Sequence, residues 1–204
     1  MLKATYRALA LVVLATVAHS TFAEGSVARG ENLTATCVAC HSGDGNSMVG
    51  TFPNIAGQHE SYLLKQMREM KAGERDVGLM VGILDTLSDQ DLQDLAAYYA
   101  TKDPGVGAAD PELAEAGEAI YRAGIPRKGI AACSACHLPA GNGNGPAVFP
   151  ALSGQWTEYT EAQLKHFRSG ARANDGDSQM MRLVARDMSD DEIAAVASYI
   201  RGLR

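Results

Sequence analysis

The sequence predicts an all-α fold built from two tandem helical domains, and three observations support this prediction. Motifs recur in the same order about 97 residues apart, which indicates a tandem duplication. Apolar residues follow good N-cap residues at helical spacing, and no run alternates as a half-buried strand would. The 204-residue chain is 46% hydrophobic and 21% charged, which excludes a disordered chain and a multi-span membrane protein.

The first segment has the pattern of a secretory signal peptide. Lys3 and Arg7 precede an apolar run over 8–18, and residues 21–23 form a small-x-small cleavage site. The apolar run is too short to span a bilayer. We therefore expect a bacterial signal peptide over residues 1–23 and a mature protein in the periplasm.

The remaining chain contains each motif twice. The repeated segments are CVACH (37–41) and CSACH (133–137), FPNIAGQ (52–58) and FPALSGQ (149–155), and LSDQDL (87–92) and MSDDEI (188–193). Tyr62, Gly73 and Arg75 also match residues 97 positions later. The segment between the copies is rich in Pro and Gly, which end helices. These observations predict an N-terminal domain at 24–103, a linker at 104–112 and a C-terminal domain at 113–204.

Each copy contains the same series of predicted helices. A short helix leads into each CxxCH motif, and a helical stretch near 60–72 has its counterpart near 157–169. The last helix of each copy begins after a serine, Ser88 or Ser189. An acidic residue follows each serine three positions later, as in a capping box.

The CxxCH motifs indicate covalent haem c. A CxxC pair alone is also compatible with a redox disulfide or half a zinc site, but the βαβ context of the first and the pair spacing of the second are missing. On a helix, Cys at i and i+3 share a face with His at i+4. Two cofactors would also compensate for an aromatic content of only 6%. We predict two haem c groups, attached through Cys37 and Cys40 and through Cys133 and Cys136, with His41 and His137 as proximal ligands.

The repeat also selects a distal ligand for each iron. The candidates are Met48, His59, Met67, Met70 and Met80 in the first copy, and His166, Met180, Met181 and Met188 in the second. Met80 matches Met181 at the 101-residue offset of the last helix, whereas both histidines are unmatched. We predict Met80 and Met181, with Met180 as the alternative in the second copy.

Ligation by His and Met leaves no open position on the iron, which favours electron transfer over catalysis. Backbone carbonyls of the matched Pro53 and Pro150 loops are candidates to orient the proximal rings. The net charge of −6 makes nucleic-acid binding unfavourable.

These motifs together resemble the dihaem cytochrome c₄ family over nearly the whole predicted mature chain. The resemblance implies two class I cytochrome c domains, His41–Met80 and His137–Met181 ligation, and helix crossings at Gly30 and Gly117 with Tyr98 and Tyr199 as aromatic partners. It also implies a periplasmic electron carrier, loosely associated with the inner membrane, between a cytochrome bc1-type donor and a terminal oxidase.

Two other functions are compatible with two haems. A dihaem peroxidase needs an open or switchable distal site, which two matched methionines argue against. A haem subunit of a periplasmic dehydrogenase, of the flavocytochrome sulfide dehydrogenase type, would have the same fold. Residues 24–103 carry a net charge of −6 and residues 104–204 one of −2. We therefore expect the N-terminal domain to dock on a basic partner, with Asp89, Asp91 and Asp94 contributing.

Overall fold

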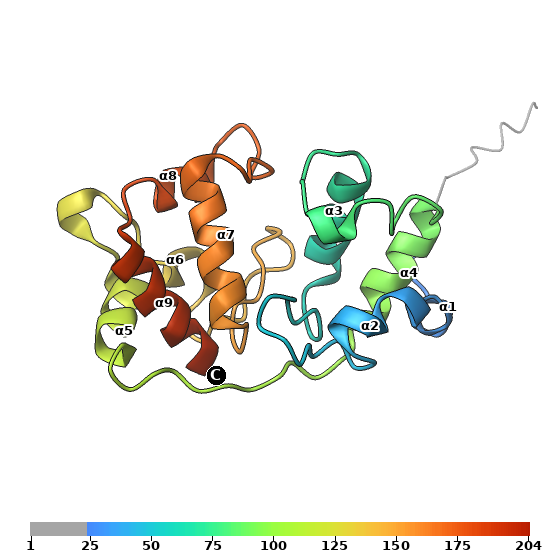
Figure 1. Ribbon diagram of the computed structural model, residues 1–204, viewed down its shortest axis with the longest axis horizontal. Coiled ribbons are helices and arrows are strands. Elements are labelled where there is room, and N and C mark those ends of the chain that lie inside the picture. Colours follow the sequence, from blue (N-terminus) through green and yellow to red (C-terminus); the bar gives the residue numbers. More distant parts are fainter. Residues whose placement is uncertain (1–23) are drawn as a thin grey trace, which may run out of the picture.

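The computed structural model describes residues 24–204, so the predicted signal peptide lies outside the described residues. Two helical domains lie side by side, and a single extended segment runs along one edge between them (Figure 1). Among residues 24–204 there is no β-strand, only isolated bridges between Ile125 and Ile130 and between Asn144 and Phe149. The all-α prediction is confirmed.

The two domains have the same order of elements, except that the fifth is a 3₁₀-helix in the N-terminal domain and an α-helix in the C-terminal domain. The N-terminal domain contains α1 (Val27–Asn32), the 3₁₀-helix η1 (Thr34–Thr36), α2 (Val38–His41), α3 (Glu60–Lys71), the 3₁₀-helix η2 (Gly78–Met80) and α4 (Asp89–Ala100). The C-terminal domain contains α5 (Ala114–Ala123), the 3₁₀-helix η3 (Pro126–Lys128), α6 (Ser134–His137), α7 (Thr157–Ser169), α8 (Met180–Ala185) and α9 (Asp190–Gly202). The predicted helices near 60–72 and 157–169 are α3 and α7.

The last helices begin where the sequence predicts. Ser88 and Ser189 each accept a hydrogen bond from the backbone N–H three positions later, and Asp91 and Glu192 accept one in return. These complete capping boxes satisfy N–H groups that a helix start otherwise leaves unpaired.

The first and last helices of each domain cross at a glycine. A Cβ atom on Gly30 would lie 2.0 Å from the carbonyl oxygen of Asp94, and one on Gly117 would lie 2.2 Å from that of Ala195. The neighbouring side chains at the crossings are Tyr98 and Tyr199, as expected. Only glycine allows the two backbones to approach this closely.

The segment between the domains is attached to both. The backbone N–H of Gly105 donates to Asn46 Oδ1 at 2.6 Å in the N-terminal domain. The N–H of Asp110 donates to Ser198 Oγ at 2.8 Å in the C-terminal domain. Across residues 24–204, no helix has the length and apolar character needed to cross a membrane.

Candidate haem sites and the domain interface

Each CxxCH motif lies on a helix of one turn that ends at its histidine. Helices α2 and α6 end at His41 and His137, and the next residues, Ser42 and Leu138, have φ angles of +63° and +65°. With ψ angles of 170° and 160°, both residues adopt a positive-φ conformation that is rare outside glycine, and it turns the chain sharply at the same point in both domains. The two motifs therefore have the same backbone geometry.

The four cysteines are free and half-buried. Burial raises the pKa of the Cys37 thiol, and it raises the pKa of Cys133 to about 11. Both thiols are protonated at neutral pH, and each packs against the hydrophobic core of its own domain. Thiols placed at i and i+3 on such a surface suit two thioether bonds to one apolar macrocycle.

The two histidines are buried and held by matched carbonyl groups. His41 Nδ1 lies 2.9 Å from the carbonyl oxygen of Pro53, and His137 Nδ1 lies 2.9 Å from that of Pro150. Because a carbonyl only accepts, Nδ1 carries the proton and Nε2 is left as the metal-binding nitrogen. Burial lowers the pKa of both imidazoles, which favours the neutral form that ligates iron. The expected role of the two proline loops agrees with this geometry.

The predicted distal methionines precede the last helix of their domains by the same number of residues but lie in different local structures. Met80 ends η2 and is half-buried, and Met181 is half-buried in the first turn of α8. The alternative residue in the second copy, Met180, is 40% exposed. The distal assignment stays a prediction, since it concerns bonds to iron.

The other candidate ligands have different surroundings. His59 Nε2 lies 2.7 Å from the carbonyl oxygen of Asn142 in the other domain, and His166 is exposed. Met188 is buried in the C-terminal core, and Met67 packs against the N-terminal core. Met48 is 86% exposed.

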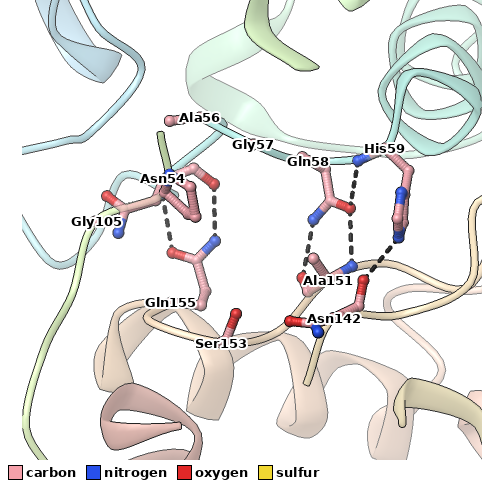
Figure 2. A pocket seen from close by; sticks show the side chains of 11 residues that line it. Asn54, Ala56, Gly57, Gln58, His59, Gly105, Asn142, Ala151, Ser153 and Gln155 are labelled. Atoms are coloured by element: carbon pink, nitrogen blue, oxygen red, sulfur yellow. Dashed lines mark hydrogen bonds between the residues drawn. The ribbon is translucent and has the colours of Figure 1, made fainter. Parts of the chain in front are cut away.

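Two matched glutamines join the domains (Figure 2). Gln58 donates to the carbonyl oxygen of Ala151 and accepts from its N–H, both at 2.9 Å. Gln155 makes the same pair of bonds to Asn54, at 2.8 and 2.9 Å. A cavity of about 250 Å³ lies between these bonded pairs. The interface is thus pseudo-symmetric, and each domain offers the other the same loop.

A buried polar cluster continues this interface. Arg75 and Arg172 are 6% and 7% exposed. Arg75 donates to Tyr159 at 3.0 Å, and Arg172 donates to Tyr62 at 2.9 Å, so each arginine binds the tyrosine of the opposite domain. The remaining acceptors of the two guanidinium groups are Gln66, Gln163 and Asn174.

The charge of this cluster suits a bound anion. Among the described residues, the two guanidinium groups hydrogen-bond only hydroxyl and amide oxygens. Burial by itself would raise the pKa of Tyr159, but Arg75 and Arg172 lower it below its usual value. The carboxylate of Glu69 lies next to this cluster and accepts from Asn174 at 2.7 Å, but it is also paired with Lys65, so it does not balance both guanidinium charges. Buried charges normally have a charged partner. A haem carries two propionates, so this cluster fits that cofactor. The CxxCH helices fit it too.

The repeat of Tyr62 and Arg75 is visible in the sequence, but their role in the interface is not. The sequence feature that pointed to a shared role is the 97-residue offset, which these two residues share with the proline loops. Asn174 was missed because it has no counterpart, since Val77 occupies the matching position.

Comparison with known proteins agrees with this geometry. The sequence model of the cytochrome c family matches residues 27–101 and again 114–204. Cytochrome c4 of Azotobacter vinelandii is 52% identical over 190 residues, covering 89% of this chain and 90% of the relative. The thiosulfate dehydrogenase electron acceptor of Stutzerimonas stutzeri is 40% identical, covering 80% of this chain and 76% of the relative.

A solved structure shares the whole architecture. The crystal structure of reduced recombinant cytochrome c4 from Pseudomonas stutzeri superposes with a TM-score of 0.87 at 48% identity, covering 88% of this chain and all of that one. Two cytochrome c domains, each with a CxxCH motif, indicate two covalent haem c groups in this chain.

Proposed function

The chain belongs to the cytochrome c4 family of electron-transfer proteins, and from this premise we propose that it carries electrons in the bacterial periplasm towards a terminal oxidase. It is an electron carrier and not an enzyme. The observation that supports the electron-transfer part of this proposal is the matched geometry of His41 and His137. Each is buried, and each uses Nδ1 on a proline-loop carbonyl.

Each residue of the two sites has a defined role in this proposal. Cys37 and Cys40 attach one haem, and Cys133 and Cys136 attach the other. His41 with Met80, and His137 with Met181, bind the two irons, while Arg75 and Arg172 neutralise propionates at the interface. Each haem supplies one-electron iron chemistry, and the protein excludes water and fixes the ligands.

The test of haem attachment is direct. The mature protein should exceed its chain mass by two haems, and its colour should survive acid–acetone extraction. Haem that extracts freely would contradict the proposal. A mature N-terminus after Ala23 would support the signal peptide and the periplasmic location.

A second candidate function shares the same haem chemistry. Because a relative named as a thiosulfate dehydrogenase electron acceptor is 40% identical, an acceptor for a periplasmic sulfur-compound dehydrogenase is the alternative. The flavocytochrome sulfide dehydrogenase type is the related possibility considered from the sequence. Proteins that copurify at low ionic strength separate these functions. An oxidase or a bc1-type complex supports the first, and a dehydrogenase supports the second.

The N-terminal domain is the one we propose to dock on a basic partner. In the loop that carries Met80, Leu79 and Val81 are 75% and 74% exposed. Acidic residues that are also exposed lie along the same segment, at Glu74, Asp76 and Asp85. In the second copy Arg182 stands in place of Val81 and forms a salt bridge with Asp175 at 2.6 Å. The first loop therefore favours a partner with an apolar centre and a basic rim.

The structure corrects the choice of acidic residues made from the sequence. Asp94 is wholly buried and accepts from the N–H of Ser26 at 2.7 Å, so it cannot contact a partner. Asp89 pairs with Arg68, and Asp91 belongs to the capping box of α4. Charge reversal at these three positions would damage the fold instead of testing docking.

The experiment is electron transfer to a basic redox protein at increasing ionic strength. Salt should slow the reaction, because it screens charges over about 8–10 Å. Reversing Glu74, Asp76 and Asp85 to Lys should flatten the salt dependence more than reversing the exposed Asp177, Asp187 and Asp191 of the other domain. Equal effects of the two sets would contradict docking by the N-terminal domain.

A further inference from the structure

A pair of tyrosine rings packs beside the first haem cysteine of each domain. In the N-terminal domain the rings of Tyr98 and Tyr99 lie 5.1 Å apart at 74°. In the C-terminal domain Tyr121 and Tyr199 lie 5.6 Å apart at 48°. Tyr99 belongs to the core cluster against which Cys37 packs, and Tyr121 to the cluster against which Cys133 packs.

Two tyrosines in these clusters, Tyr99 and Tyr121, come from helices that do not correspond in the repeat. Tyr99 lies on the last helix of its domain, α4, whereas Tyr121 lies on the first helix of its domain, α5. At the 101-residue offset of the last helices, the position of Tyr99 is occupied by Ile200, which is 3% exposed. Tyrosines from helices that do not correspond in the repeat thus pack in the clusters of the two equivalent cysteines.

The hydroxyl groups of Tyr99 and Tyr121 differ in their hydrogen bonding. Tyr121 donates to the carbonyl oxygen of Leu138 at 2.7 Å. The Tyr99 hydroxyl is buried and makes no hydrogen bond of good geometry in the described part of the chain, although the Cys37 sulfur lies close enough to influence its pKa. A buried polar group without a partner costs about 1–3 kcal/mol, so a partner is expected in the complete protein.

The group that changes chemically beside Tyr99 is Cys37. Burial raises the pKa of Tyr99, and the neighbouring Cys37 thiol raises it further, so the hydroxyl keeps its proton at all ordinary pH values. When Cys37 bonds to haem, its sulfur loses the thiol hydrogen and can only accept a hydrogen bond. The Tyr99 hydroxyl is then the donor that this sulfur lacks.

We propose that Tyr99 donates a hydrogen bond to the thioether sulfur of Cys37 and thereby raises the reduction potential of the N-terminal haem. This proposal rests on the covalent haem of the proposed function. A donor at the sulfur withdraws electron density from the edge of the macrocycle and stabilises the reduced iron. Tyr99 is a positioning residue, since it acts through Cys37.

The same interaction is not open to the C-terminal haem. The hydroxyl proton of Tyr121 is used on the carbonyl of Leu138, the residue that follows α6. Ile200 offers no hydrogen-bonding group. The difference between Tyr99 and Tyr121 therefore gives the two haems unequal surroundings.

The test compares Tyr99→Phe with the matched control Tyr121→Phe in the dihaem protein. We expect Tyr99→Phe to lower the midpoint potential of the haem attached at Cys37 and to leave the other unchanged. Tyr121→Phe should leave both potentials unchanged and lower the free energy of unfolding. Unchanged potentials in Tyr99→Phe, or equal shifts at both haems, would overturn the proposal.

A second measurement uses the unmodified protein. In the reduced state, nuclear magnetic resonance should show a slowly exchanging Tyr99 hydroxyl proton with an Overhauser contact to the Cys37 β-protons. A hydroxyl proton that contacts another group instead would also overturn the proposal. If either test fails, the mass of the protein still includes two haems. If covalent attachment itself fails, the mass lacks the haems, so mass spectrometry distinguishes the two failures.

Discussion

The two domains share their haem helices but differ in how their cores are built. The connected core of the C-terminal domain contains ten buried residues, whereas that of the N-terminal domain contains five. Cys37 follows Gly30 by seven positions, and Cys133 follows Gly117 by sixteen. The longer connection includes Ile125 and Ile130, which are both buried in the larger core.

The helix crossings show the same contrast at one position. Ala195 lies opposite Gly117, but the matching residue opposite Gly30 is Asp94, a buried carboxylate. Arg29 lies 3.0 Å from Asp94 and is 60% exposed at its side chain. Haem attachment and close helix crossing are thus kept in both copies, while the N-terminal copy uses polar contacts where the C-terminal copy uses apolar packing.

The largest expected effect concerns the methionine that we propose as distal ligand in each domain. Met80→Ala and Met181→Ala should each remove about half of the weak charge-transfer band of an iron–sulfur(Met) bond and lower the potential of one haem. Visible and near-infrared spectra with a redox titration check this. If Met180→Ala has this effect and Met181→Ala does not, the assignment in the second domain is wrong.

The glycines at the two crossings should also be equivalent. Gly30→Ala and Gly117→Ala should each destabilise one domain by about 3 kcal/mol, because the new Cβ would collide with a backbone carbonyl. Gly43→Ala is the control, since no atom lies within 4 Å of a Cβ at that position. Thermal unfolding measures the effect. A tolerated Gly30→Ala would contradict the close approach of α1 and α4.

The buried carboxylate of Asp94 is a feature in which the two domains differ. Asp94→Ala should destabilise the N-terminal domain by about 2 kcal/mol, since it leaves the Ser26 N–H without its acceptor. The exposed Asp191→Ala in the other domain should change stability by less than about 0.5 kcal/mol. Domain-resolved hydrogen exchange distinguishes the two. Equal effects would mean that the buried carboxylate contributes nothing specific.

The reciprocal glutamines test whether the domains unfold together. Gln58→Ala and Gln155→Ala should each cost about 1–2 kcal/mol, because each removes two interdomain hydrogen bonds. Calorimetry should then show one transition separating into two. An unchanged single transition in the double variant would show that other contacts couple the domains.

The smallest expected effect concerns the stability of the C-terminal domain at low pH. Although burial raises the pKa of Glu192, its bonds to Lys128 and to the Ser189 cap hold it below the usual value. Because the folded pKa is depressed, this stabilisation is present above about pH 4.3 and is lost as the pH falls through the folded pKa. Glu192→Gln should reduce the loss of unfolding free energy that the C-terminal domain shows on acidification, by less than about 1 kcal/mol. An unchanged loss on acidification would contradict this role.

The sequence predicted most of the fold because its strongest signals are local. Serine caps, helical spacing and the CxxCH motif each fall within a few residues, and the repeat predicts two domains. The roles of Arg75, Gln58 and Tyr99 could not be predicted, because their partners are distant in the chain. The buried position of Asp94 was missed for a related reason. Its partner Ser26 lies on another segment, and an acidic residue on a predicted surface helix ordinarily faces water.

The most direct test of two like-ligated but unequal haem sites is a spectroelectrochemical titration of the purified dihaem protein. The account predicts two one-electron steps of equal spectral amplitude at different potentials, both from low-spin six-coordinate iron. The Cys37-attached haem should titrate at the potential that Tyr99→Phe lowers. Two haems that titrate at one common potential in both the parent protein and the variant would contradict the account.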